Sequence, residues 1–350
     1  MCSFILLISD NPFDQDLLLD ANKDIETRGP DKLTINSWKQ NDKYIHTIHN
    51  LLDISGMTIQ QPILKNKRKI LLFNGEIYST KKQSKSDTEF LYDIFLLNKL
   101  FDSLTSLSGE YAIASLDLDL YNLSLFTDLI GTKPLYFSIK SGVIGVSSYS
   151  SPLLKLGFTE VEAVPPNTHL EIDLKDFDSS VIKRQRIYQL DLEQKNNSLE
   201  DWNISFLKSI RERVDHYNSK VFVPLSSGYD SGAICCALNK LSIPYVTVTL
   251  GDSENLEILN ERIRINKNLF CKEHYHLPSI SKKEFRYNSD WLHNKLGLIR
   301  YHHIEGHKNY PMALHEDSGA IALKLICEFM ASKGYNSLIS GSGADEIISE

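Results

Sequence analysis

Short apolar or alternating runs, separated by turn residues, fill the first half of the chain. Runs of this length and period predict β-strands. Successive strands joined by tight connections favour antiparallel sheets over parallel ones. The predicted strands are Phe4–Ser9, Lys69–Phe73, Tyr111–Asp119, Leu123–Asp128, Leu135–Ile139 and Val143–Ser147.

One helix stands out among these strands, and it is predicted to run from Ser86 to about Phe101. Ser86 can cap its first turn, and Glu89 three residues later completes a capping box. Its apolar residues recur at helical spacing, which predicts one buried face. They are Phe90, Leu91, Ile94, Leu97 and Phe101.

The pattern changes after about residue 195, and the polar stretch Leu190–Ser198 is the predicted linker. Helical and strand patterns alternate beyond it, which predicts a doubly wound parallel sheet with ligands bound past the carboxyl ends of its strands. The predicted helices are Trp202–Tyr217, Ser231–Leu241, Glu254–Asn266, Ile280–Lys295 and Gly319–Gly334, and the predicted strands are Val221–Leu225, Tyr245–Leu250 and Ser337–Ser340.

Length and composition fit two globular domains, predicted at residues 1–190 and 200–350. The net charge of −7 argues against a nucleic-acid partner. No run approaches the ~20 apolar residues that a membrane span needs. The five cysteines are odd in number and lack CxxC spacing, so we expect no disulfide framework or zinc site, and a reducing cytoplasm as the location.

Cys2 is the most informative single residue. Removal of Met1 would place its thiol and a free α-amino group on one residue, which makes a compact nucleophile and base. A cysteine at position 2 is weak evidence alone, and the hypothesis depends on motifs found further along the chain.

Two glycine-containing loops follow predicted strands in the second half. In the first, small residues and the hydroxyls of Ser226, Ser227 and Ser231 could cradle a polyphosphate, and Asp230 would then need a cation such as Mg²⁺. A polar turn in which Asp230 only caps a helix is the alternative. The second loop, residues 340–346, has the same pattern and a carboxylate at Asp345.

Structural alternatives also exist for the motifs of the first half. Asn74-Gly75 is a common turn dipeptide, and residues 86–89 could be a helix cap without a further role. The segment Arg28–Asp31 could be a surface turn. Taken together these alternatives are less convincing, because they do not explain the order in which the motifs occur.

The motifs together resemble the glutamine-dependent asparagine synthetase family over essentially the whole chain. MCS at the start, RGPD (28–31), NGEIY (74–78), SDTE (86–89) and GTKPLY (131–136) resemble its class II glutamine amidotransferase domain. SSGYDS (226–231) and SGSGADE (340–346) resemble its ATP-pyrophosphatase domain. The resemblance implies an αββα sandwich of the N-terminal nucleophile type, followed by the doubly wound parallel α/β sheet.

The resemblance also implies roles for individual residues. Cys2 would attack the side-chain amide of glutamine and form a thioester, with Asn74 and Gly75 as the oxyanion hole. Glu76 and Asp87 would hold the α-ammonium group of glutamine. The ammonia released would cross to the second domain.

There, by the same resemblance, ATP and Mg²⁺ would activate a carboxylate acceptor, and ammonia would convert it to an amide with release of AMP and pyrophosphate. Asp230 and Asp345 would carry the Mg²⁺. The implied partners are therefore the small molecules glutamine, ATP and the acceptor, and a homodimer is left open. The implied nucleotide-binding residues are Leu225, Ser226, Ser227, Gly228, Asp230, Ser231, Leu250, Gly251 and Gly341.

The chain departs from the family pattern in four places. Leu51 stands where the family has an arginine that grips the carboxylate of glutamine, and Arg68 or Lys67 could compensate. Ser342 replaces a catalytic glutamate, and the first loop reads SSGYDSG where SGGLDSS is commoner. The chain also stops at Glu350, soon after the second loop.

These departures leave alternatives open. The leading hypothesis is an ATP- and glutamine-dependent amidotransferase, a carbon–nitrogen ligase. A glutaminase with a degenerate synthetase domain and a non-catalytic nucleotide-binding relative are the rivals.

Overall fold

The computed structural model divides into two compact units, Met1–Glu193 and Gln194–Glu350, and each is described here by itself. The residues described are 2–53, 59–63, 67–78, 86–140, 142–175, 182–191, 193, 195, 197–217, 220–251, 254–296, 300–305 and 308–341.

Two antiparallel sheets form the body of the first unit, as the sequence predicts. The first sheet has the order β2-β3-β1-β8-β7-β9, and the second has the order β11-β10-β6-β5-β4. The strands are β1 (Ser3–Ser9), β2 (Lys32–Gln40), β3 (Lys43–Leu51), β4 (Lys69–Ile77), β5 (Gly109–Asp117), β6 (Asn122–Thr127), β7 (Tyr136–Lys140), β8 (Val143–Ser147), β9 (Glu162–Ala163), β10 (Thr168–Asp173) and β11 (Ile182–Arg186).

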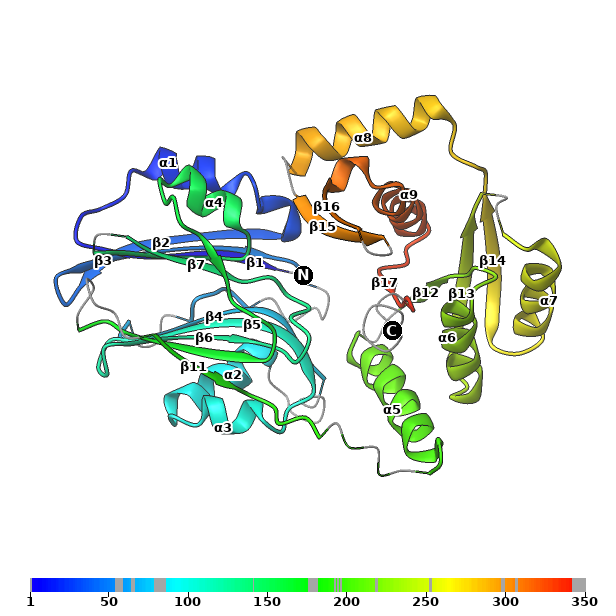
Figure 1. The fold of residues 1–350 in the computed structure, drawn as a ribbon, viewed down its shortest axis with the longest axis horizontal. Helices are drawn as coiled ribbons and strands as arrows, with labels where there is room; N and C mark the ends of the chain where they lie inside the picture. The colour runs from blue at the N-terminus through cyan, green and yellow to red at the C-terminus, as the bar shows by residue number, and fades with distance from the viewer. Residues whose placement is uncertain are drawn as a thin grey trace. The chain divides into compact units, whose positions relative to one another are not determined.

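Helices cover the outer faces of both sheets, so the first unit has four layers in the order α, β, β, α (Figure 1). Helices α1 (Gln15–Asn22) and α4 (Ser150–Lys155) pack on the first sheet. Helices α2 (Asp87–Leu96) and α3 (Leu100–Leu104) pack on the second. An apolar core that includes Phe4 lies between the sheets. The αββα architecture is therefore present in the first unit.

The single predicted helix from Ser86 to Phe101 is two helices. The capping box of Ser86 and Glu89 is present at the start of α2. The helix ends after Leu96 because Asn98 has a φ of 56°, a left-handed conformation that an α-helix cannot contain. The apolar periodicity continues across the break, which is why the pattern predicted one element.

The second unit contains a parallel four-stranded sheet of order β14-β13-β12-β17. Its strands are β12 (Val221–Pro224), β13 (Tyr245–Leu250), β14 (Cys271–Leu277) and β17 (Ser337–Leu338). Its helices are α5 (Glu200–Tyr217), α6 (Tyr229–Lys240), α7 (Leu256–Lys267), α8 (Lys282–Leu296) and α9 (Ser318–Ser332).

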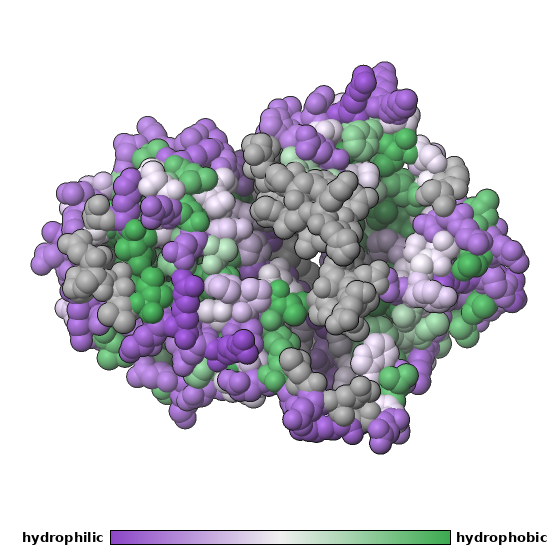
Figure 2. Space-filling model, viewed as in Figure 1, coloured by the Kyte–Doolittle hydropathy of each residue, from purple (hydrophilic) through white to green (hydrophobic). Residues whose placement is uncertain are grey.

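Both faces of this sheet are covered, as expected for a doubly wound arrangement. Residues of α5, α6 and α7 share one core with Val221 and Val223. Residues of α9 share a second core with Phe222 and Val246, whose side chains point to the opposite face. Helix α8 packs against α9, and hydrophilic residues dominate the surface over α8 in Figure 2. The sequence did not predict β14 or the antiparallel pair β15 (Arg300–Glu305) and β16 (Lys308–Ala313).

Within the described residues, no helix is both long enough and apolar enough to cross a membrane.

Candidate functional site

Cys2 lies directly before β1 and beside β3. Because Ser3 pairs with Asn50 and Phe4 pairs with His49, the register places Cys2 next to Leu51. The Cys2 Sγ accepts a hydrogen bond from the backbone N–H of Leu52 at 3.5 Å. Leu51 therefore lies beside the candidate nucleophile.

The backbone next to Cys2 is held by buried hydrogen bonds. The Ser3 hydroxyl donates to the carbonyl of Ile25 at 2.8 Å and accepts from the Asn50 amide at 3.0 Å. The side chains of Asn50 and Asn22 bond each other in turn. These contacts tie the start of β1 to α1 and β3, so the position of the thiol is fixed by structure around it.

Burial raises the pKa of the Cys2 thiol, an effect partly offset by the Leu52 backbone and by Arg28. The negative charge of Glu76 raises the pKa further. The thiol is therefore protonated at neutral pH and needs a base before it can attack. The α-amino group that removal of Met1 would expose is such a base on the same residue.

Asn74 lies inside β4, paired with Ala112, and its side chain is fully buried. Like Ile70 and Leu72, Asn74 points from β4 into the space between the two sheets. Phe4 of β1 lies in the same core on the opposite side. Neither the nitrogen nor the oxygen of its carboxamide has a hydrogen-bond partner among the described residues. An unpaired buried amide costs about 1–3 kcal/mol, and this one has a donor available for an oxyanion.

Gly75 is the next residue of β4 and has a φ of 154°. A Cβ there would lie 2.0 Å from the backbone oxygen of Glu110 on β5. The dipeptide Asn74-Gly75 is thus part of a paired strand, and its interpretation as a turn is wrong. The turn interpretation rested on the local preference of the Asn-Gly dipeptide, and this preference carries no information about strand pairing.

Glu76 and Asp87 come from adjoining elements. Glu76 lies on β4, and Asp87 is the first residue of α2. The Asp87 carboxylate accepts a hydrogen bond from the backbone N–H of Ile77 at 2.6 Å, which ties the helix to the end of β4. Because Glu76 also acts on the pKa of Cys2, the structure brings these predicted residues to one region.

The GTKPLY motif has a structural role here. The buried Asp128 carboxylate accepts hydrogen bonds from the backbone N–H groups of Tyr111 and Thr132. Lys133, which is 7% exposed at its side chain, pairs with Glu110 at 3.0 Å. Glu110 is the cross-strand partner of Glu76, so Lys133 compensates negative charge next to the predicted ammonium site.

Arg28 is a residue that the sequence analysis did not assign to the site. Its guanidinium donates to the Tyr149 hydroxyl and lies 5.1 Å from the centre of that ring. Gly29 packs so closely on β3 that a Cβ would be 2.1 Å from the Asn50 oxygen. The RGPD segment therefore places a cation whose charge lowers the pKa of Cys2, and the motif itself was the signal in the sequence that could have found it.

The suggestion that Arg68 replaces the missing arginine is wrong. Arg68 forms an ion pair with Asp119 and a hydrogen bond with Asn41. It also precedes β4, whereas Asn74 and Glu76 lie near the other end of that strand. Lys67 precedes Arg68 and is excluded by the same position.

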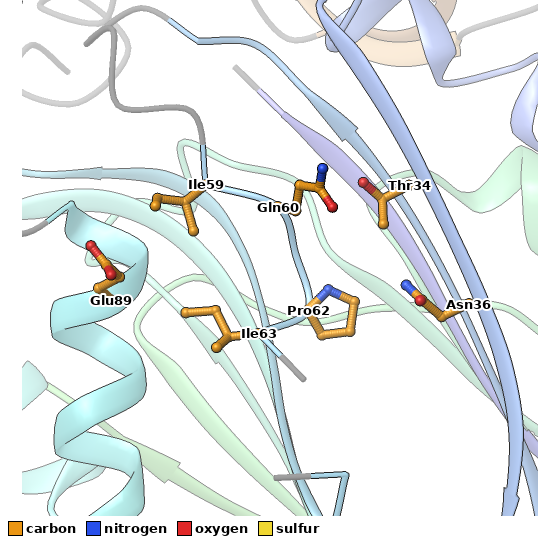
Figure 3. A pocket seen from close by; sticks show the side chains of 7 residues that line it. All are labelled: Thr34, Asn36, Ile59, Gln60, Pro62, Ile63 and Glu89. Carbon is orange, nitrogen blue, oxygen red and sulfur yellow. The ribbon is translucent and has the colours of Figure 1, made fainter. Parts of the chain in front are cut away.

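A pocket of about 340 Å³ lies in the first unit between β2, α2 and the segment that joins β3 to β4. Figure 3 shows the lining side chains, which come from these three parts of the chain. Next to it, the Gln61 side chain donates to the carbonyl of Phe73 and accepts from its N–H. Gln61 thus pairs with the edge strand β4 one residue before Asn74. The lining residues are Thr34, Asn36, Ile59, Gln60, Pro62, Ile63 and Glu89.

In the second unit, the predicted nucleotide residues lie at the carboxyl ends of parallel strands. Leu225 directly follows β12, Leu250 ends β13 and Gly251 comes next. Leu225 and β13 are tied together, since the Leu225 N–H donates to Val248 and the Thr249 hydroxyl donates to the Leu225 carbonyl. The edge of the sheet that binds ligands in such folds is therefore formed by these residues.

The loop between β12 and α6 is held by its own serines. The Ser226 N–H donates to the Ser231 hydroxyl at 3.0 Å, and the two hydroxyls lie 2.9 Å apart. The Gly228 N–H donates to the Ser226 hydroxyl at 3.1 Å. Ser226 and Ser231 thus shape the loop as well as offering hydroxyls.

Two charged side chains that the sequence analysis missed contact this loop. The Glu254 carboxylate accepts hydrogen bonds from both the N–H and the hydroxyl of Ser227, each at 2.5 Å. The Arg262 guanidinium donates to the carbonyls of Ser226 and Gly228. A carboxylate of the chain itself therefore occupies donors that a phosphate would use.

The two predicted loops meet at Asp230. A Cβ on Gly341 would lie 2.4 Å from the Asp230 Cβ, so Gly341 lies directly against Asp230. Asp345 and Ser342 lie outside the described residues. The predicted pairing of Asp230 with Asp345 on one metal ion therefore stays a prediction. Among the residues that the structure covers, no group of three or more His, Cys, Asp or Glu side chains could hold a metal ion.

Comparison with known proteins identifies the first unit. The model of a family described as a glutamine amidotransferase domain matches residues 1–186. A search of curated proteins found no match. Because the family model covers more than half of the chain, the chain belongs to this glutamine amidotransferase family.

Two solved structures are similar to the chain as well. One is described as the allosteric regulatory enzyme of purine biosynthesis, with 13% identity, coverage of 84% of this chain and 88% of the other, and a TM-score of 0.42. The other is glutamine phosphoribosylpyrophosphate amidotransferase from B. subtilis, complexed with ADP and GMP, with 14% identity, coverage of 84% and 89%, and a TM-score of 0.42.

Proposed function

We propose that this protein hydrolyses glutamine at Cys2 and uses the ammonia, with ATP, to convert a carboxylate into an amide in its second unit. This is the reaction of the asparagine synthetases, whose motifs the chain resembles. The observation that carries the first half is the set at one end of the sandwich: a half-buried thiol, a buried carboxamide without a hydrogen-bond partner among the described residues, and two carboxylates. The experiment that tests it is glutamine hydrolysis by the purified chain, measured as glutamate and ammonia.

In the proposed first half-reaction, Cys2 attacks the amide carbon of glutamine and its proton passes through the α-amine to the leaving ammonia. The Asn74 carboxamide donates to the oxygen on which negative charge develops. Glu76 and Asp87 bind the α-ammonium group, since two carboxylates favour one cation.

We further propose that Arg28 binds the α-carboxylate of glutamine in place of the family's arginine at position 51. Arg28→Ala should raise the KM for glutamine by about 10- to 100-fold with a smaller change in kcat, because a charge-assisted hydrogen bond contributes about 1.5–3 kcal/mol. Steady-state hydrolysis kinetics measure both constants. Arg68→Ala is the matched control, because Arg68 pairs with Asp119 and should leave the KM unchanged. Equal effects of the two substitutions would contradict the assignment.

The proposed second half-reaction uses the loop at residues 226–231 for the phosphates of ATP, with Asp230 as a ligand of Mg²⁺. Support comes from the place of the loop at the carboxyl end of β12 and from the contact of Gly341 with Asp230. Leu225, Leu250 and Gly251 would form the nucleoside part of the pocket. Mg²⁺ would supply positive charge to the pyrophosphate leaving group.

Asp230→Asn should therefore lower carboxylate-dependent pyrophosphate release by about 100-fold or more, because a metal stabilises charge in the transition state by several kcal/mol. Glutamine hydrolysis should persist. Asp290→Asn is the control, because Asp290 is an exposed helical carboxylate on α8 of the same unit, and it should leave both activities unchanged. Pyrophosphate release that survives Asp230→Asn would remove Asp230 from the metal site.

A glutaminase without synthetase activity is the second candidate, and the contact between Glu254 and Ser227 favours it. A screen of carboxylates for substrate-dependent exchange between pyrophosphate and ATP separates the two. Exchange with any carboxylate supports the synthetase. Glutamine hydrolysis with no exchange across the screen supports the glutaminase.

A further inference from the structure

Three polar side chains interrupt the apolar packing between the two sheets of the first unit. Thr47 and His49 lie on β3, and Asn74 lies on β4. All three residues are fully buried. No hydrogen bond of normal geometry reaches their five side-chain polar atoms from a described residue. The His49 ring makes only a weaker contact, with the Phe73 backbone. Buried polar groups in folded proteins are almost always paired, with protein or with water, so this cluster calls for an explanation.

His49 lies on β3, the neighbour of the nucleophile strand β1 in the first sheet. It pairs with Phe4 of β1 on one side and with Thr34 of β2 on the other. Phe4 is two residues after Cys2, and residues two apart in a strand share a face. On the opposite sheet, a contact with the Phe73 backbone raises the pKa of the imidazole against the larger effect of burial. Phe73 directly precedes Asn74.

Burial lowers the pKa of His49 to about 3, which favours the neutral imidazole at neutral pH. A neutral ring carries one N–H donor and one acceptor nitrogen. A neutral ring can join two polar groups without placing a charge in the apolar core. It cannot act as a general base for Cys2, because its affinity for a proton is too low.

The Asn74 carboxamide needs a hydrogen-bond partner that fixes its orientation. A carboxamide can rotate by half a turn at little cost, and only one of the two orientations presents its N–H₂ to an oxyanion. Gln61 fixes the backbone of Phe73 on the free edge of β4. No described residue fixes the side chain of Asn74 by a hydrogen bond.

We propose that His49 is a positioning residue for the oxyanion hole. Its N–H points to the Phe73 carbonyl, and its second nitrogen binds a buried water that donates to the Asn74 side-chain oxygen. The Asn74 N–H₂ is then held toward the carbonyl oxygen of the substrate. This inference depends on the glutamine hydrolysis proposed for Cys2.

His49→Leu should lower the kcat of glutamine hydrolysis by about 10- to 100-fold, a part of the ~10²–10³-fold that a lost oxyanion donor costs. The KM should change less than about threefold, because Glu76 and Asp87 hold another part of glutamine. His49→Asn keeps a donor and an acceptor and should recover part of the loss. It also serves in place of His49→Leu if that variant does not fold.

The deciding measurement is a double-mutant cycle with Asn74→Ala. If His49 acts through Asn74, His49→Leu should lower kcat by less than about twofold in the Asn74→Ala background. Effects that multiply would overturn the inference.

Inhibition by L-glutamate γ-semialdehyde is a second readout, since its carbonyl carbon bonds to the Cys2 sulfur while the thiol proton moves to the oxygen. His49→Leu should weaken this inhibitor about tenfold, and unchanged inhibition also overturns the inference.

His169→Leu is the control for the loss of a buried neutral imidazole. His169 is buried in the same unit but is bonded to Ser124 and Gln185 on the second sheet, so its removal should lower the unfolding temperature and leave kcat unchanged. Equal kcat losses in the two histidine variants would assign His49 a purely structural role. Wild-type protein that neither hydrolyses glutamine nor captures the aldehyde would overturn the proposed function, and with it this inference.

Discussion

Replacing Cys2 by alanine should reduce glutamine hydrolysis to the background rate, a loss of roughly 10⁴-fold or more, because a nucleophile acts as a unit with its base and oxyanion hole. Amide formation from added ammonia should continue, since that step is proposed for the other unit. Paired assays with glutamine and with ammonium as the nitrogen source measure the two activities separately.

Cys236→Ala is the matched control for this experiment. Cys236 is exposed on α6 in the second unit, and its loss should change neither activity. Hydrolysis of glutamine by the Cys2→Ala protein would show that another group is the nucleophile. Mass analysis of the active protein adds an independent check, because the proposed mechanism requires a chain that begins at Cys2.

Gly75→Ala should both destabilise the first unit and abolish glutamine hydrolysis. The added Cβ would lie 2.0 Å from the Glu110 backbone oxygen, so β4 and β5 must separate where Asn74 is held. A clash with backbone in a paired strand belongs to the most damaging class of substitution, and we expect a loss of about 3 kcal/mol or more in the free energy of unfolding. Chemical denaturation and hydrolysis kinetics provide the two measurements.

The control for Gly75→Ala is Gly157→Ala. Gly157 also has a positive φ, 90°, but a Cβ there would meet no atom within 4 Å. Gly157→Ala should lower the free energy of unfolding only through its strained backbone conformation, by about 1–3 kcal/mol. Its kcat should stay unchanged. The interpretation fails if Gly75→Ala leaves stability and kcat at wild-type values, because β4 and β5 would then tolerate a side chain at this position.

Hydrophobic patterning predicted six strands of the first unit with largely apolar buried positions, and it missed strands with polar buried positions. It also missed β10, although Leu170 and Ile172 are buried there. Among the strands with polar buried positions, β3 is the clearest case, because His46, Thr47, His49 and Asn50 are all buried in it. A search for apolar alternation does not recognise such a strand. Its partner β2 was not predicted either. The sequence therefore did not show which residues of β3 lie beside Cys2.

Helices of the second unit were predicted more closely, because their apolar residues recur at helical spacing and face one layer. β14 escaped prediction because four of its seven residues, in CKEHYHL, are charged or histidine. Charged residues occur there because the strand is at the edge of its sheet. Edge position depends on the order of strands, which the local sequence does not contain.

The sequence by itself determined the identity and the order of the chemical groups: a cysteine at position 2, the amidotransferase motifs and two serine- and glycine-rich loops. Only the tertiary structure decided which groups meet. It placed Leu51 beside Cys2, Arg28 near the thiol, Glu254 on Ser227 and His49 across from Phe73. The physical reason is that such neighbours depend on strand register and on packing between elements far apart in the chain, whereas motifs record only local spacing.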